Sequence, residues 1–320
     1  MDKFIEYCLT DQLGKAQRFY RMCNPEDINF DEIFYDLFYE LCFDGNLHIA
    51  KWLCDIYYKE YNELFRSCCN RGDIKLAKSL YELNDVDIYD RDPSELYGVG
   101  NAFEYACLYN NLEIAKWLFD ISDKAKLNIY SYIDIIFVRV GSNDLEMLQW
   151  VYTLSEYDDT ILRSAFMEAC LGDKIDNAKW LYSLGTINVH AHDDAAFVES
   201  CISGHLDVAK WLYYELGDVN IHAYSCNSNK ERDYAFKWSL YMGKLDVAQW
   251  LYSLDGEIDV RSGNDQIFKY ICEKPKYKFN HKFSRSEIAR WLCTLCEDYS
   301  VEILGDDIKY MIRKIENINI

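Results

Sequence analysis

The stretch GHLDVAKWLYYELGDVNIHA, residues 204–223, is the clearest copy of a motif that recurs along the whole chain. It predicts a turn at Gly204 and His205, followed by a helix whose apolar residues stand three and four positions apart and form one broad face. Gly217 can adopt the left-handed conformation that ends such a helix. The stretch therefore predicts one turn–helix unit that must bury its apolar face against another unit.

Imperfect copies of this unit occur from one end of the chain to the other. The alanine before Lys-Trp, once replaced by leucine, aligns them at Ala16, Ala50, Ala77, Ala115, Leu148, Ala178, Ala209, Ala248 and Ala289. The tryptophan two positions later recurs at Trp52, Trp117, Trp150, Trp180, Trp211, Trp250 and Trp291. A period of roughly 33 residues is typical of a solenoid, in which each unit packs on the next. We therefore expect one array rather than two globular domains.

A second pattern predicts another helix before each of these turns. A phenylalanine is followed four residues later by a cysteine, at Cys42, Cys69, Cys107, Cys170, Cys201 and Cys272. Because the register repeats, we interpret these cysteines as small buried hydrophobes rather than as a disulfide framework, and we expect a reducing compartment. Short β-prone tails such as INVH at 187–190 follow the second helix and predict β-hairpin arms.

These residues resemble the ankyrin consensus. GHLD at 204–207 matches its Gly-His-Leu-acidic turn, and GDVN at 217–220 matches the start of its hairpin. The resemblance implies an all-α ankyrin-repeat solenoid of about nine helix-turn-helix units with short β-hairpin arms. The AKWLY style is similar to ankyrin proteins of giant, amoeba-infecting viruses of the mimivirus type, which implies a viral protein in the host cytoplasm. Residues 195–198 (AAFV) depart from the consensus Thr-Pro-Leu-His, so the hydrogen bonds of that Thr and His are missing there.

The domain organisation follows from how well each part of the chain fits the motif. We expect a single array over 1–320, made of a degenerate N-terminal capping repeat (1–30), ankyrin-like repeats (31–296) and a C-terminal capping helix (297–320). Longer irregular loops interrupt the repeats at 90–100, 225–233 and 273–285. Loops on a rigid scaffold are where binding specificity tends to collect.

The charge of the chain limits its partners. A formal net charge of −20 argues against nucleic acid, which needs clustered Lys and Arg, and favours a basic or neutral protein partner. The alternative is that the charge only keeps a tyrosine-rich array soluble. No apolar run approaches the ~20 residues that span a bilayer, and the N-terminal sequence lacks the apolar region of a signal peptide. We therefore expect a cytoplasmic, monomeric protein without membrane contact.

One cluster in the sequence resembles a metal site. His190 and His192 would share one face of an extended arm, with Asp193 and Asp194 beside them. The competing interpretation is a polar, solvated hairpin tip without metal. We favour the second interpretation, because equivalent positions elsewhere in the chain carry other residue types.

Two further patterns resemble sites of chemistry but lack essential parts. Cys293 and Cys296 form a CxxC without the second pair that a zinc site needs, so packing explains them better. The GVGN stretch at 98–101 lacks the third glycine and the preceding strand of a dinucleotide-binding loop. No Ser-His-Asp arrangement occurs either. We therefore expect no enzymatic activity, cofactor or metal.

The resemblance also points to a binding surface. In the ankyrin fold the residues just before the inter-helix turn line a concave groove, and the hairpin tips lie beside it. The corresponding groove residues are Phe43, Asp44, Asn70, Arg71, Leu108, Tyr109, Leu171, Gly172, Ile202, Ser203, Tyr241 and Met242. The corresponding tip residues are Tyr89, His190, His192, Asn220, His222 and Arg261. Aromatic residues and Met are enriched at protein interfaces, although the same row could instead be covered by the chain itself.

The sequence therefore predicts a non-enzymatic scaffold that binds a host or viral protein through this groove and these tips. A structural or virion-associated viral protein is the alternative, and a metal-binding or enzymatic protein ranks last. No F-box or BTB segment is recognisable, so the sequence does not indicate a ubiquitin-ligase adaptor.

Overall fold

The computed structural model describes residues 2–23, 30–57, 61–83, 86–91, 100–123, 129–222, 232–255, 257–272 and 285–296. Within these ranges every regular element is a helix and no strand occurs, so the expected helical class is confirmed. None of these helices is long and apolar enough to cross a membrane. The chain divides into two compact units, Met1–Tyr157 and Asp158–Ile320, and each is described by itself.

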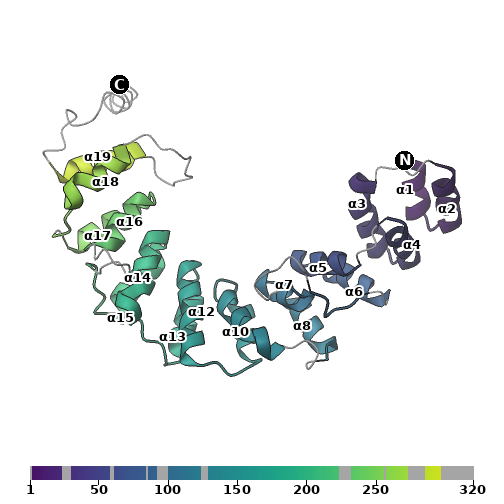
Figure 1. Ribbon diagram of the computed structural model, residues 1–320, viewed down its shortest axis with the longest axis horizontal. Coiled ribbons are helices and arrows are strands. Elements are labelled where there is room, and N and C mark those ends of the chain that lie inside the picture. Colours follow the sequence, from purple (N-terminus) through teal and green to yellow (C-terminus); the bar gives the residue numbers. More distant parts are fainter. Residues whose placement is uncertain are drawn as a thin grey trace. The chain divides into compact units, whose positions relative to one another are not determined.

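The first unit consists of helix–turn–helix pairs (Figure 1). Its helices are α1 (Asp2–Leu9), α2 (Leu13–Met22), α3 (Phe30–Phe43), α4 (Leu47–Tyr57), α5 (Tyr61–Arg71), α6 (Ile74–Glu82), α7 (Ala102–Leu108), α8 (Leu112–Ile121), α10 (Ile129–Val140) and α11 (Leu145–Tyr152). Each first helix packs on the second helix of its own pair, and first helices of successive pairs also touch, as α5, α7 and α10 do. Each pair corresponds to one copy of the sequence motif.

The second unit repeats this plan. Its helices are α12 (Asp159–Leu171), α13 (Ile175–Ser183), α14 (Ala191–Ser203), α15 (Leu206–Leu216), α16 (Tyr234–Tyr241), α17 (Leu245–Leu254), α18 (Ser262–Cys272) and α19 (Arg285–Leu295). The first helices α12, α14, α16 and α18 follow one another in a row, as the green to yellow part of Figure 1 shows. The expected C-terminal capping helix lies outside the described residues.

In six of the described repeats, aromatic rings join the repeat to the one before it. Trp211 packs with ring centroids 6.3 Å from Phe166 and 6.1 Å from Tyr182, which belong to the first and second helix of the preceding pair. We call this recurring contact the aromatic ladder; its other members are Trp52 with Phe4 and Tyr20, Trp117 with Phe65 and Tyr81, Trp150 with Phe103 and Phe119, Trp250 with Phe197 and Tyr213, and Trp291 with Phe236 and Tyr252. The inter-repeat packing expected from the tryptophan spacing is therefore confirmed.

The first unit closes its last pair with a residue of its own. Tyr157 stacks on Phe137 with ring centroids 4.0 Å apart and also lies 5.8 Å from Tyr152. Its hydroxyl donates to the carbonyl of Val151 at 3.0 Å, and burial raises the pKa of this phenol well above its usual value. Tyr157 thus covers the kind of ring pair that a tryptophan covers elsewhere in the ladder.

Two of the turns between paired helices need glycine for two reasons, whereas Asp11, Asn110 and Asp173 adopt a positive φ in other such turns. Gly204 has φ +86° at the end of α14, in the left-handed region that L-residues disfavour. A Cβ there would also lie 2.5 Å from Cδ of Lys244, which comes from the following repeat. Gly72 in the first unit is similar, with φ +83° and Oδ1 of Asn111 at 2.5 Å from the position of a Cβ. The glycines therefore let successive repeats approach closely.

The cysteine that recurs in the first helices is buried wherever its side chain is described. This holds for Cys42, Cys69, Cys107, Cys170 and Cys201, all of which are free thiols. Burial raises the pKa of Cys42 and of Cys170 to about 12, with smaller effects of neighbouring groups. Their interpretation as small buried hydrophobes is confirmed, while the side chain of Cys272 lies outside the described residues.

Candidate functional site

The predicted groove residues lie where the first helices end and the inter-helix turns begin. Among those whose side chains are described, none is buried, and three large apolar ones are well exposed. Tyr109 is 56% exposed, Leu171 38% and Met242 37%. The side chain of Phe43 lies outside the described residues. An apolar surface is therefore present at this position of at least three repeats.

The remaining groove residues are more polar or more covered. Asp44 and Arg71 are exposed; the partly exposed ones are Asn70, Leu108, Gly172, Ile202, Ser203 and Tyr241. The row is thus mixed, with apolar positions separated by polar ones, as at a protein interface that has a polar rim.

The helix ends that carry this row are held by the following repeat. The side-chain amide of Asn111 donates to the carbonyls of Cys69 and Asn70, at 2.8 Å and 2.7 Å. A helix leaves its last four carbonyls without partners inside the helix, and this amide satisfies two of them. The sequence did not indicate this contact, because its partners are more than 40 residues apart.

The same link recurs with other residues. The amide of Asn143 donates to the carbonyls of Cys107 and Leu108, at 2.8 Å and 3.2 Å. Nε2 of His205 lies 2.8 Å from the carbonyl oxygen of Leu171. Side chains from one repeat thus fix the backbone on which the groove residues of the preceding repeat stand.

A group of partly exposed aromatic rings lies on α16 and α18. Tyr241 meets Trp238 at 5.5 Å and Tyr270 at 4.8 Å between ring centroids, edge to face in both cases. The Arg285 guanidinium lies 5.2 Å from the centre of the Tyr270 ring. Trp238 is the one tryptophan outside the repeated motif, and that exception could have drawn attention to this group.

The linkers between repeats run as turns, and the expected β-hairpin arms do not occur in their described parts. In four of the linkers, within the described residues, an Asp or Asn side chain accepts a hydrogen bond from the N–H group two residues later. The pairs are Asp87 with Tyr89, Asn188 with His190, Asn220 with His222, and Asp259 with Arg261, at 2.9–3.1 Å. Because this local bond satisfies the N–H group, the segment has less need of a strand partner.

Four of the predicted tip residues therefore occupy one equivalent position of these turns. Tyr89 also accepts a hydrogen bond from the N–H of Asp123 at 2.7 Å. His192 is exposed, with φ +57° in the irregular first turn of α14. The tips contact their own chain, and their role toward a partner stays a prediction.

A buried carboxylate joins two successive linkers in the second unit. Oδ1 of Asp194 lies 2.7 Å from Nδ1 of His190, in the linker before α14. Oδ2 of the same residue accepts a hydrogen bond of 3.0 Å from the N–H of Asn220, in the linker after α15. The carboxylate of Asp194 thus connects the linkers on either side of α14 and α15.

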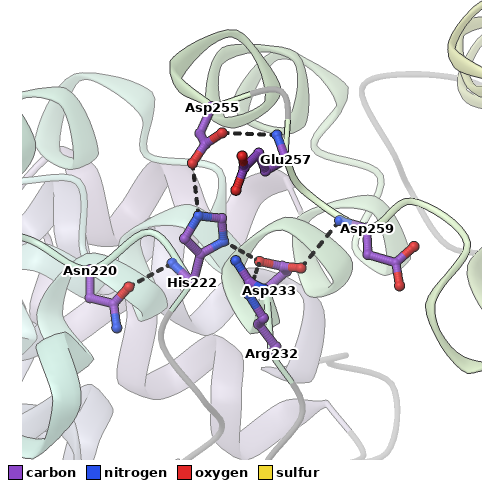
Figure 2. A network of polar contacts seen from close by, with 7 residues as sticks. All are labelled: Asn220, His222, Arg232, Asp233, Asp255, Glu257 and Asp259. Atoms are coloured by element: carbon purple, nitrogen blue, oxygen red, sulfur yellow. Dashed lines mark hydrogen bonds and ion pairs between the residues drawn. The ribbon is translucent and has the colours of Figure 1, made fainter.

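The next repeat contains the same link in a more elaborate form (Figure 2). Asp233 is 1% exposed at the start of α16, and its Oδ1 lies 2.5 Å from Nδ1 of His222. Its Oδ2 accepts a hydrogen bond of 3.3 Å from the N–H of Asp259, in the following linker. Nε2 of His222 faces Oδ2 of Asp255 at 3.0 Å, just after α17. One imidazole thus lies between two carboxylates from different elements.

Electrostatics around His222 favour its charged form. Burial lowers its pKa, but the hydrogen bonds to Asp233 and Asp255 outweigh burial and hold the pKa above its ordinary value. The N–H of Glu257 and the imidazole lower the pKa of Asp255 in turn. Nε of Arg232 lies 3.8 Å from Asp233 and acts weakly against the imidazolium.

The geometry expected for a metal site is wrong. His192, Asp193 and Asp194 all have positive φ, so no extended arm places the two histidines on one face. Nδ1 of His190 is engaged by Asp194 instead. Over the described ranges, no group of three or more His, Cys, Asp or Glu side chains is arranged to hold a metal ion.

The other two chemical patterns have structural explanations. The buried Glu104 carboxylate accepts hydrogen bonds from the N–H groups of Gly100 and Asn101, the groups that a phosphate-binding loop would present. An ion pair with Arg91, at 3.2 Å, balances the charge of Glu104. Cys293 is partly exposed on α19, and burial raises its pKa, so its reactive thiolate is disfavoured.

Comparison with known proteins does not add a family to this picture. No protein-family model matches the chain, and no curated protein matches it in sequence. Most of the three predicted loops, at 92–99, 223–231 and 273–284, and residues 297–320 lie outside the described residues. The surface at the helix ends and the linker contacts are thus the features from which function can be argued.

Proposed function

We propose that the chain is an ankyrin-like scaffold that binds another protein through the exposed ends of its first helices. One observation carries the proposal: Tyr109, Leu171 and Met242 expose large apolar side chains at nearly the same position of three different repeats. Side chains of these types are costly to leave in water, and Tyr and Met are common at the centre of protein interfaces.

The way these residues are held supports the proposal. Asn111, Asn143 and His205 fix the backbone at the helix ends of the preceding repeats. A surface held in place before binding loses little conformational entropy when a partner docks. The net charge of −20 favours a partner that is neutral or basic.

Three features support the ankyrin-like assignment. Helix–turn–helix pairs follow one another at the spacing of the motif, and left-handed glycines such as Gly204 lie in the turn between paired helices. Linkers with side-chain-capped turns follow the second helices. The proposal of a non-enzymatic role is supported by the described polar clusters, in which Glu104, Asp194 and Asp233 bond to groups of their own chain.

A pair of matched double variants tests the function. Tyr109→Ala with Met242→Ala removes two exposed groove side chains, while Tyr214→Ala with Met22→Ala removes the same residue types from exposed positions on second helices. When each protein is immobilised, we expect the wild type and the Tyr214/Met22 variant to bind the same set of proteins. The Tyr109/Met242 variant should no longer bind them. Equal retention by both variants, with all three proteins folded by circular dichroism, would place the binding surface elsewhere.

A further inference from the structure

We propose that His222 forms a pH-sensitive junction between consecutive repeats of the second unit. Its imidazolium form links the linker after α15, the start of α16 and the end of α17, and loss of its proton loosens these three elements from one another. The proposal is independent of the binding function, because it concerns how the array holds itself together.

The geometry of the ring carries the argument. Nδ1 faces Asp233 at 2.5 Å and Nε2 faces Asp255 at 3.0 Å, so both nitrogens have a carboxylate oxygen as their neighbour (Figure 2). A neutral imidazole has one N–H, and its other nitrogen would then direct a lone pair at a carboxylate oxygen. Only the imidazolium has two N–H groups and can donate to both carboxylates. The contacts therefore select the protonated ring.

Because Asp233 is buried, loss of the proton from His222 should affect the structure around it. Its carboxylate is 1% exposed, and its neighbours are the imidazolium, the N–H of Asp259 and the distant Nε of Arg232, at 3.8 Å. An ionised carboxylate inside a protein is costly unless a cation and hydrogen bonds compensate it. Deprotonation of His222 removes the nearer cation, so we expect the bond from Asp259 and the next linker to loosen.

The other charged groups around the ring favour the same state. Asp255 approaches from the end of α17, where its Oδ1 accepts a 2.8 Å hydrogen bond from the N–H of Glu257. On the linker of His222 itself, Asn220 accepts from the N–H of His222 and donates its own N–H to Asp194. Arg232 is the one opposing cation among the described neighbours, and it is about half exposed. Carboxylates therefore dominate the surroundings of the ring.

The sign of the pH dependence follows from the two pKa directions. His222 has a folded-state pKa above its unfolded value, so its contribution is complete below about pH 6.5 and is lost as the pH rises through the folded-state pKa. Asp255 has a lowered pKa, so its contribution is present above about pH 4 and is lost as the pH falls through its folded-state pKa. The junction is thus closed between the folded-state pKa of Asp255 and that of His222, and it opens as the pH rises through the latter.

Nuclear magnetic resonance of the full chain tests the proposal directly. We expect a histidine signal that titrates above the ordinary value, with both ring nitrogens protonated below its midpoint, and we expect this signal to vanish in His222→Gln. The amide signals of Glu257 and Asp259 should shift with the same midpoint. This measurement on the wild-type protein holds even if a variant folds poorly.

Hydrogen exchange supplies the structural readout. After correction for intrinsic rates, protection of the Asp259 amide should fall as the pH rises through the midpoint, by about tenfold for each unit that separates the folded from the unfolded pKa. In His222→Gln that protection should be low and independent of pH, whereas His192→Gln, which removes an exposed histidine of the same unit, should behave as the wild type. A His222 that titrates at or below its ordinary value, or an Asp259 amide whose protection does not follow the titration, would overturn the proposal.

Discussion

The two units hold consecutive repeats together at the same places but with different chemistry. In the first unit, the amides of Asn111 and Asn143 cap the helix ends of the preceding repeat, and Oδ1 of Asn62 accepts the N–H of Asp87 in the next linker. In the second unit, His205 lies at the helix end and the buried Asp194 and Asp233 accept the linker N–H groups.

Position in the repeat therefore decides which backbone groups need a partner, while the residue type that supplies the partner can vary. An Asn amide does not titrate, so the links made by Asn111 and Asn143 are independent of pH near neutrality. The buried aspartates of the second unit each have a histidine beside them, and histidine is the side chain that changes charge in that range. The link through His222 is thus the one whose strength we expect to vary with pH, and the comparable contact of the first unit, between His48 and Asp11, is much more exposed.

The aromatic ladder is what the two units share, and its loss should have the largest effect. Trp150→Ala in the first unit and Trp211→Ala in the second should each lower the free energy of unfolding by about 3–5 kcal/mol, because each leaves a cavity between two repeats. Urea unfolding followed by circular dichroism measures this loss. Trp238→Ala, outside the ladder, serves as the control; an equal loss there would contradict the role of the ladder.

Glycine-to-alanine substitutions in the turns between paired helices should lower the free energy of unfolding by different amounts in the two units. Gly72→Ala should cost about 2–4 kcal/mol, because it combines a strained φ with displacement of the hydrogen-bonded Asn111 amide. Gly204→Ala should cost less, since the flexible Lys244 side chain can move away. Gly185→Ala, with φ +87° and no atom near the added methyl, isolates the strain. If thermal unfolding shows that Gly204→Ala lowers the Tm more than Gly72→Ala does, this order is contradicted.

Removal of one amide should test the polar link of the first unit. Asn143→Ala should cost about 1–3 kcal/mol, because two carbonyls at the end of α7 lose their donor. Asn143→Asp should cost more, since a carboxylate would face the negative end of that helix. Asn143→Ala should lower the free energy of unfolding by the same amount at pH 6 and at pH 8. His222→Gln should lower it less at pH 8 than at pH 6. Denaturant titrations at both pH values distinguish the two behaviours.

The smallest effect should come from the exposed groove residue. Tyr109→Ala should change the free energy of unfolding by no more than about 0.5 kcal/mol, because its side chain is 56% exposed. Leu118→Ala, fully buried one helix away on α8, is the matched comparison and should cost several times more. If Tyr109→Ala strongly lowers the free energy of unfolding in the same denaturant assay, this side chain contributes to packing.

The helices and their packing could be predicted from the sequence, and the linkers could not. Phe166, Cys170 and Trp211 recur at regular spacing, because every repeat has to present the same apolar face to its neighbour. The helix-turn-helix order followed from that regularity. The β-hairpin arms were an inference from alternating residues, and side-chain-capped turns met the hydrogen-bonding needs instead.

The carboxylate–histidine links were hidden by irregular spacing. His190 and its Asp194 are four residues apart, while His222 and its Asp233 are eleven apart, since the longer loop separates them. The same contact therefore corresponds to two different His–Asp spacings in the sequence. Neither spacing is conspicuous in a chain that contains so many acidic residues. The cap formed by Asn111 spans 41 residues or more and is equally invisible to local patterns.

The buried cysteines have a practical consequence for measuring how the array opens. Cys42, Cys107, Cys170 and Cys201 lie in four different repeats, and each is inaccessible while its first helix stays packed. An alkylating reagent can modify such a thiol only when that repeat opens, so peptide mapping after timed exposure would give a separate opening rate for each repeat. The native cysteines thus report the opening rate of each of these repeats, and no probe has to be engineered into the chain.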